Sequence, residues 1–81
     1  MTVLDTVLHA VAAELQTPRG DIDPDLPLTT AHGVDSVMLL RAVVVIEEAL
    51  SVAIPDDVLF EALTARELAE LVTRLRDGAH G

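Results

Sequence analysis

The residue best suited to chemistry in this sequence is Ser36, which follows Asp35 where a polar stretch meets an apolar one. Asp is a favoured helix N-cap, and residues 37–50 contain no proline or glycine, so Ser36 is predicted to lie in the first turn of a helix. Backbone N–H groups in that turn lack intrahelical partners, and the helix dipole is positive there. A phosphate carried on Ser36 would therefore be stabilised.

A hydrolase would need Ser36, His32 and Asp35 to meet as nucleophile, base and orienting acid. Residues this close along a loop–helix junction rarely converge in that geometry, and the sequence has no Gly-x-Ser-x-Gly elbow. We therefore predict no catalytic residues and interpret His32 as a loop residue. His9, on the polar side of a helix, and His80, in the tail, are interpreted as exposed bystanders.

Three carboxylates, Asp21, Asp23 and Asp25, have the opening spacing of a calcium-binding loop. The sixth position of such a loop requires glycine and the twelfth requires glutamate, whereas Leu26 and His32 stand at these positions. The sequence therefore departs from the calcium-loop pattern at two positions that determine the geometry of the loop. No metal site is predicted, and the three carboxylates are interpreted as part of a solvated turn.

The composition limits the classes of partner. The 81 residues suffice for one domain, residues 1–81, which is too small for a deep catalytic cleft. A net charge of -9, with five arginines and no lysine, argues against nucleic acid or an anionic membrane as a partner. No apolar run approaches the ~20 residues of a membrane span, and a cytoplasmic protein is expected. Without cysteine, any thiol chemistry needs a thiol from another molecule.

Apolar residues recur at helical intervals near the amino terminus and predict a first helix over about residues 3–16. Thr2 and Asp5 have the spacing of a capping box at its start. The stretch 18–35 holds three prolines and two glycines and is predicted to be one long loop. Four apolar side chains are expected to anchor this loop to the helices: Ile22, Leu26, Leu28 and Val34.

The second helix is predicted over residues 36–50 and is apolar on more than one face. One stripe can face the first helix: Leu39, Ala42, Val43, Ile46 and Leu50. A second stripe lies on an adjacent face: Val37, Leu40 and Val44. Such a helix is either buried all round or carries a binding face, and the small size of the chain favours the binding face. Glu47 and Glu48 are unfavourable near the carboxyl end of a helix, so a basic partner would offset their cost.

Two more helices are predicted in the last third of the chain. A short helix is expected over about residues 55–63, with proline in its first turn. Thr64 and Glu67 have capping-box spacing at the start of a last helix that ends near residue 78, and residues 79–81 are expected to fray. Three longer helices and one short helix, with a long loop between the first two, predict an all-α fold, a small antiparallel four-helix bundle.

These features together resemble the acyl carrier protein family of phosphopantetheine-dependent carriers, over nearly the whole chain. The attachment motif of that family, Gly-x-Asp-Ser-Leu at the head of the second helix, corresponds here to Gly33-Val34-Asp35-Ser36-Val37. The downstream Ile54-Pro55 and Leu63-Thr64 pairs are also in register. The resemblance implies that a transferase attaches the phosphopantetheine of coenzyme A to Ser36 through a phosphodiester, with Asp35 as the flanking helix cap. The terminal thiol would then hold an acyl or aminoacyl group as a thioester, on a carrier without catalysis of its own.

The resemblance also implies partners. These are the phosphopantetheinyl transferase, an enzyme that loads the arm, and downstream synthase or tailoring enzymes, all acting on a monomer. By position, six residues of the second helix would face them: Val37, Leu40, Arg41, Val44, Glu47 and Glu48. The second apolar stripe inferred from periodicity falls on the same surface.

Departures from the family pattern bear on the pathway. Val37 replaces the usual leucine, which keeps an apolar residue after the serine. Met38, Leu39 and Arg41 stand where fatty-acid carriers tend to be acidic or polar. These departures favour a dedicated partner, in polyketide or related specialised biosynthesis, over the general enzymes of fatty-acid synthesis.

The subtype rests on weaker features. Peptidyl carriers tend to show Gly-Gly-His-Ser or Gly-Gly-Asp-Ser, so a single glycine with Asp35 favours the acyl type. The chain begins at Met1 and ends soon after the last predicted helix, so a freestanding carrier is expected. Two alternatives stay open. One is a peptidyl or aminoacyl carrier of a nonribosomal peptide pathway, and the other is a non-carrier helical interaction module in which Ser36 only begins a helix.

Overall fold

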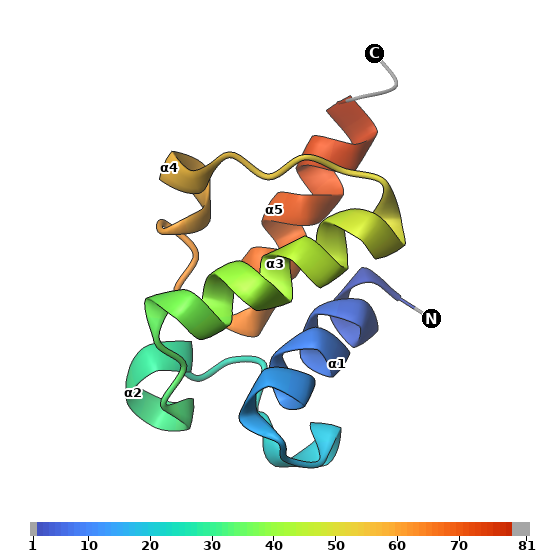
Figure 1. Ribbon diagram of the computed structural model, residues 1–81. Helices are drawn as coiled ribbons and strands as arrows, with labels where there is room; N and C mark the ends of the chain where they lie inside the picture. Colours follow the sequence, from blue (N-terminus) through green and yellow to red (C-terminus); the bar gives the residue numbers. More distant parts are fainter. Residues whose placement is uncertain (1, 79–81) are drawn as a thin grey trace.

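The computed structural model describes residues 2–78, which form a small bundle of helices (Figure 1). The longer helices are α1 (Val3–Leu15), α3 (Ser36–Leu50) and α5 (Ala65–Gly78). The shorter helical segments are a 3₁₀ turn η1 (Arg19–Asp21), α2 (Leu28–His32) and α4 (Asp56–Leu59). No strand forms within residues 2–78, and the prediction of a small all-α bundle is confirmed.

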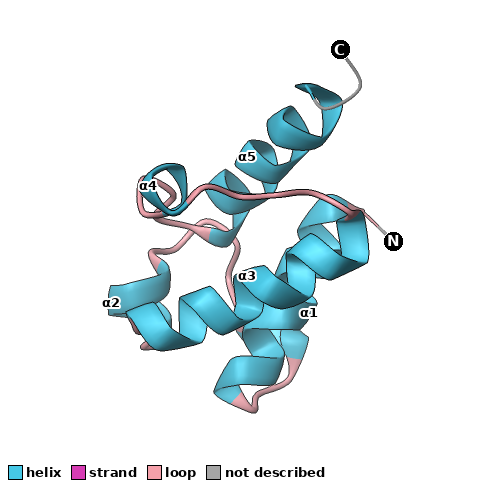
Figure 2. Cartoon of the chain, turned by 45° about the horizontal axis from the view of Figure 1, so that its top comes forward, coloured by secondary structure: helices cyan, strands magenta, loops and turns pink. Residues whose placement is uncertain are grey.

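Helix α1 is the element against which the others pack. The predicted capping box at its start is present: the Asp5 N–H donates to the Thr2 hydroxyl and the Thr2 N–H donates to the Asp5 carboxylate, each at 3.1 Å. The apolar face of α1 packs against both α3 and α5. Figures 1 and 2 show α1 running against the direction of both helices. The amphipathic first helix predicted over residues 3–16 is therefore confirmed.

The core is aliphatic, as the composition requires. The largest side chains with almost no exposure come from all three long helices and from α4: Val7, Val11, Ile46, Leu59, Leu68 and Val72. No polar or charged side chain among residues 2–78 is buried. Because apolar burial contributes about 25 cal/mol per Å², these side chains supply most of the free energy that holds the helices together.

The prediction of an unbroken loop over residues 18–35 is wrong, because η1 and α2 lie within it. Pro27 stands at the N-cap position of α2 with φ −59°, and this fixed φ suits the residue before a helix. A helix of five residues is too short to show a 3.6-residue period, so the pattern gave no signal for it.

Three of the four predicted anchors of this segment are confirmed: Ile22, Leu28 and Val34 are buried. The fourth, Leu26, is wrong, since 45% of it remains exposed. Backbone hydrogen bonds also anchor this segment to the rest of the protein. The Leu28 N–H donates to the Leu63 carbonyl at 2.9 Å, and the Arg66 N–H donates to the Pro24 carbonyl at 3.0 Å. The segment is therefore tied to the start of α5.

An ion pair adds to this tie. Arg66 Nε lies 2.5 Å from Asp25 Oδ1. The hydrogen bond from Arg66 holds the pKa of Asp25 below its ordinary value of 3.8, and the same bond raises the pKa of Arg66. A carboxyl group whose pKa is lowered by folding stabilises the fold at neutral pH. This contribution is lost as the pH falls through the folded-state pKa of Asp25.

The last third of the chain follows the prediction with two differences. The short helix α4 ends at Leu59, well before residue 63, and Pro55 lies at its N-cap position instead of in its first turn. At the start of α5 the Glu67 N–H donates to the Thr64 hydroxyl at 3.1 Å, as a capping box requires. The Glu67 carboxylate, however, accepts from the Leu63 N–H and not from that of Thr64. The predicted fraying of residues 79–81 concerns residues outside the described part of the chain.

Across the described residues, no helix is long and apolar enough to span a membrane.

Candidate functional site

Each residue of the turn that leads from α2 into α3 has a specific role in placing Ser36. Gly33 ends α2 with φ +71°, a left-handed conformation that side chains rarely adopt. Val34 is buried, and its N–H donates to the Leu28 carbonyl at 3.0 Å. Asp35 is extended and is the N-cap of α3, with its carboxylate accepting from the Met38 N–H at 2.8 Å. Such a cap stabilises a helix by about 1 kcal/mol.

Ser36 is the first residue of α3 and is exposed. Its hydroxyl makes no hydrogen bond to any other residue between 2 and 78. The N–H groups of Ser36 and Val37 also have no protein acceptor within that part of the chain, since the Asp35 cap takes the next N–H along. The hydroxyl is thus free to react, beside N–H groups that can stabilise a negative charge.

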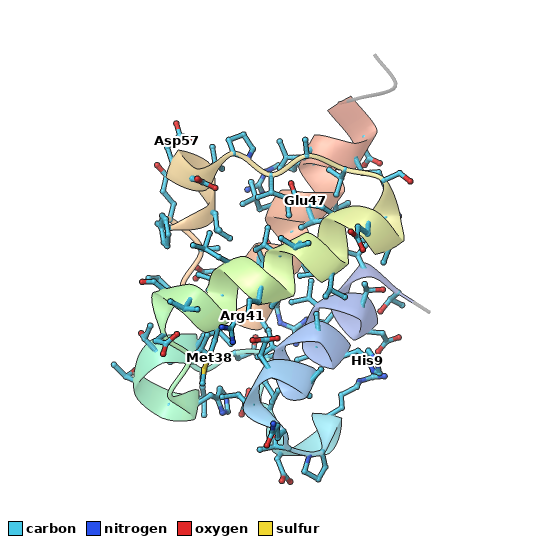
Figure 3. The ribbon with its side chains drawn as sticks, viewed as in Figure 1. His9, Met38, Arg41, Glu47 and Asp57 are labelled. Carbon is cyan, nitrogen blue, oxygen red and sulfur yellow. The ribbon has the colours of Figure 1, made fainter. Side chains whose placement is uncertain are left out.

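Among residues 2–78, the hydrogen bonds of His32 are to Asp23 and not to Ser36. The His32 Nε2 lies 3.3 Å from both the backbone nitrogen and the carbonyl oxygen of Asp23. Asp23 precedes α2 in the chain, whereas Ser36 follows it. His9 is exposed on α1, as predicted (Figure 3). His80 falls outside the described residues. Within residues 2–78, no three His, Asp or Glu side chains are grouped so as to hold a metal ion.

A small pocket of about 100 Å³ opens beside Ser36. Most of its lining is apolar and comes from α2, α3 and the turn between α4 and α5: Leu28, Val34, Leu39, Phe60, Ala62 and Leu63. Phe60 and Leu63 are 51% and 62% exposed. Neither was predicted from the sequence to lie near Ser36. The one available signal was that Phe60 is the only Phe, Tyr or Trp residue of the sequence.

The outer face of α3 carries exposed apolar side chains next to the serine. Ala42, Val43 and Ile46 of the predicted inner stripe are buried, and Leu39 and Leu50 are half-buried. The predicted outer stripe is exposed: Val37, Leu40 and Val44. Val45 is 48% exposed and joins it, which the stripe pattern did not include. The exposure of this face is therefore confirmed.

The charged residues of α3 differ from one another in their contacts. Arg41 is exposed, and its Nη1 lies 3.7 Å from Glu14 Oε1 on α1. Glu48 is also exposed. Glu47 is half-buried, and its carboxylate accepts from the Ile54 N–H at 2.8 Å. Figure 3 shows Glu47 directed from α3 toward the connector that follows it.

The expectation that a basic partner would offset the cost of Glu47 near the end of α3 is not required by the structure, because Glu47 has an acceptor role within the molecule. The connector folds back through Ser51, which is left-handed with φ +53°. This turn brings the Ile54 N–H to the Glu47 carboxylate, and the Val52 N–H donates to the Glu47 carbonyl at 3.2 Å. The cost of an acid in the last turn of a helix is offset within the molecule.

Comparison with known proteins agrees with this geometry. A family model described as "Phosphopantetheine attachment site" matches residues 5–72, a range that includes the junction at Ser36. A comparison with curated proteins found no match. Members of the matched family carry a covalently attached phosphopantetheine group. Because the match spans most of the sequence, the chain belongs to the phosphopantetheine-dependent carrier proteins, the family of the acyl carrier proteins.

Proposed function

We propose that Ser36 receives the phosphopantetheine group and that the protein carries acyl intermediates for enzymes of polyketide or related specialised biosynthesis, without catalysis of its own. The observation that carries this proposal is an exposed serine hydroxyl at the start of α3, with no hydrogen-bond partner among residues 2–78. Membership of the carrier family supports this function over that of a non-carrier interaction module.

The attachment step is a transfer to the Ser36 hydroxyl from coenzyme A. A bond forms between Oγ and the phosphorus that bears pantetheine, while that phosphorus loses its bond to the bridging pyrophosphate oxygen. Adenosine 3′,5′-bisphosphate leaves, and the hydroxyl proton passes to a base of the transferase. When bound, the arm supplies a terminal thiol that holds an acyl group as a thioester.

Residues of this chain fit the phosphodiester that results. Its single negative charge would stand beside the N–H groups of Ser36 and Val37 and at the positive end of the α3 dipole. The Asp35 carboxylate is already bonded to the Met38 N–H, which leaves these two donors to the phosphodiester. The turn between α2 and α3 thus supplies both the nucleophilic hydroxyl and the groups that stabilise the product.

The acyl subtype is supported by the residue before Asp35. Peptidyl carriers tend to have a second glycine there, whereas this chain has Val34, whose side chain is buried and anchors the turn. Because a glycine in its place would bury no side chain, the turn in this protein is built differently from the peptidyl pattern.

The proposed function can be tested on protein purified from its native host and digested with trypsin. Cleavage after Arg19, Arg41 and Arg66 places the two serines of the chain on different peptides, 20–41 and 42–66. We expect phosphopantetheine, with an acyl group free of an α-amine, on peptide 20–41. A modified peptide 42–66 would refute the assignment of Ser36. An aminoacyl group on peptide 20–41 would refute the acyl subtype alone.

Enzymes that reach Ser36 must also cover the surface next to it. We therefore propose the outer face of α3 as their docking surface, formed by Val37, Leu40, Arg41, Val44 and Glu48. Glu47, the sixth residue predicted for this surface, is bonded to the connector and contributes less to it. The apolar side chains of the docking surface are exposed although they are large, which is typical of a surface that is covered in a complex.

Val44→Asp tests this docking surface. Val44 is 52% exposed, so the variant should fold as the wild type does. A carboxylate desolvated against an apolar enzyme surface costs at least 1–2 kcal/mol, so we expect the kcat/KM of the phosphopantetheinyl transferase to fall by about ten-fold or more. The measurement is the rate of mass gain together with the thermal unfolding midpoint. His9→Asp, at an exposed position of α1, is the matched control and should keep the wild-type rate. A collapse of the unfolding midpoint in Val44→Asp would instead place Val44 in the core.

A further inference from the structure

The pocket beside Ser36 is too small for a long acyl chain. Its volume is about 100 Å³, whereas an engineered apolar cavity of about 150 Å³ holds one benzene molecule, so the pocket has room for a group of only a few carbons. Its lining is apolar apart from Thr29, Asp35 and Ser36, and the Asp35 carboxylate is already bonded to the Met38 N–H. The pocket therefore suits a compact, branched hydrocarbon group close to the serine.

We propose that this pocket binds the branched carbon of the phosphopantetheine arm, the quaternary carbon that carries two methyl groups. This inference rests on the proposed attachment at Ser36. A quaternary carbon with two methyl groups amounts to three hydrocarbon groups, which agrees with the room available. Burial of these methyl groups against Phe60 and Leu63 would also remove from water part of the apolar surface that both side chains now expose.

The order of groups along the arm favours the branched carbon over the cargo as the occupant of the pocket. The branched carbon is separated from the phosphate by one ester oxygen and one methylene, so it is the first apolar group reached from Ser36. The thiol lies at the far end, beyond two amide groups. Since Ser36 itself lines the pocket, the branched carbon can enter directly, whereas the cargo could enter only if the arm folded back on itself. The thioester is thereby left outside, where partner enzymes can reach it.

Proton NMR of the arm methyl groups tests the inference. The protein is converted with coenzyme A and a phosphopantetheinyl transferase, and the conversion is confirmed by intact mass. Phe60 is the only Phe, Tyr or Trp residue in the sequence, so its ring current marks any methyl group that lies in the pocket. We expect both arm methyl signals to be displaced from their positions in free phosphopantetheine, which lacks the adenine ring of coenzyme A, with nuclear Overhauser effects to the Phe60 ring. Phe60→Leu keeps an apolar lining and should abolish the ring-current displacement at full conversion.

Substitutions at two leucines distinguish binding in the pocket from a general effect of the apolar surface. Leu63 lines the pocket, whereas Leu26 is exposed elsewhere at 45%. Leu63→Ser should move the arm methyl signals toward those of free phosphopantetheine, and Leu26→Ser should leave them unchanged. Equal effects of the two variants would overturn the pocket assignment.

The outcomes distinguish this inference from the proposed function. If the wild-type protein gains no mass, the attachment at Ser36 and the inference that rests on it both fail. If the mass is gained but the arm methyl signals match those of free phosphopantetheine, the pocket assignment alone fails. If a loaded acyl group shows the Phe60 displacement while the arm methyl groups do not, the pocket belongs to the cargo and the inference is again overturned.

Discussion

Ser36→Ala is expected to abolish the addition of phosphopantetheine. The substitution removes the only proposed nucleophile while alanine remains favourable in the first turn of a helix, so α3 should be retained. Within residues 36–78, the other hydroxyl at the start of a long helix is that of Thr64, which already accepts from the Glu67 N–H, so we do not expect it to take over. The measurement is intact mass after incubation with coenzyme A and a broad-specificity phosphopantetheinyl transferase.

Ser51 provides the control, because it is the only other serine. It lies at the opposite end of α3 in a left-handed conformation, so Ser51→Gly removes its hydroxyl without backbone strain. This variant should be modified as fully as the wild-type protein. An unmodified wild type, or an equal mass gain on Ser36→Ala, would contradict the carrier assignment of Ser36.

Ile46→Ala should produce the largest loss of stability. Ile46 is 0% exposed on the inner face of α3, so the truncation leaves a cavity that the surrounding side chains can fill only in part. We expect the free energy of unfolding to fall by about 2–5 kcal/mol. A domain of this size has a total of only about 4–12 kcal/mol, at roughly 0.05–0.15 kcal/mol per residue. The measurement is urea denaturation followed by circular dichroism.

Val45→Ala is the matched control for this loss, since Val45 precedes Ile46 on the same helix and is 48% exposed. Its truncation removes little buried surface, and the better helix propensity of alanine offsets part of that loss. The unfolding midpoint of Val45→Ala should therefore stay near that of the wild type. Equal destabilisation by the two substitutions would contradict the assignment of the inner and outer faces of α3.

The long helices could be predicted from the sequence because their signals are local. The capping box at Thr2 and the N-cap at Asp35 fix where α1 and α3 begin, and both are present as predicted. The position of Ser36 follows from the second of these caps. The apolar period also separated the two faces of α3 correctly, because a helix of fifteen residues is long enough to display it.

The short elements and the pocket could not be predicted in the same way. Helix α2, with five residues, is too short to display the apolar period, whereas α4 was predicted from the proline at its start but ends at Leu59 and not near residue 63. The partner of Glu47 depends on a left-handed turn at Ser51 that brings Ile54 back along α3. The position of Phe60 beside Ser36 depends on how the turn after α4 meets α3. Both contacts reach beyond a single helix, so helical periodicity carries no information about them.

The junction between α2 and α3 has a mechanical consequence. Only three residues separate the two helices, and each is held: Gly33 by its conformation and hydrogen bond, Val34 by burial and Asp35 by its cap. The serine hydroxyl is therefore a fixed pivot. With the proposed attachment at Ser36, the part of the arm beyond the branched carbon would sweep a volume set by its own length and not by deformation of the protein. The arm could then reach several enzymes in succession while the shape of the carrier stays the same.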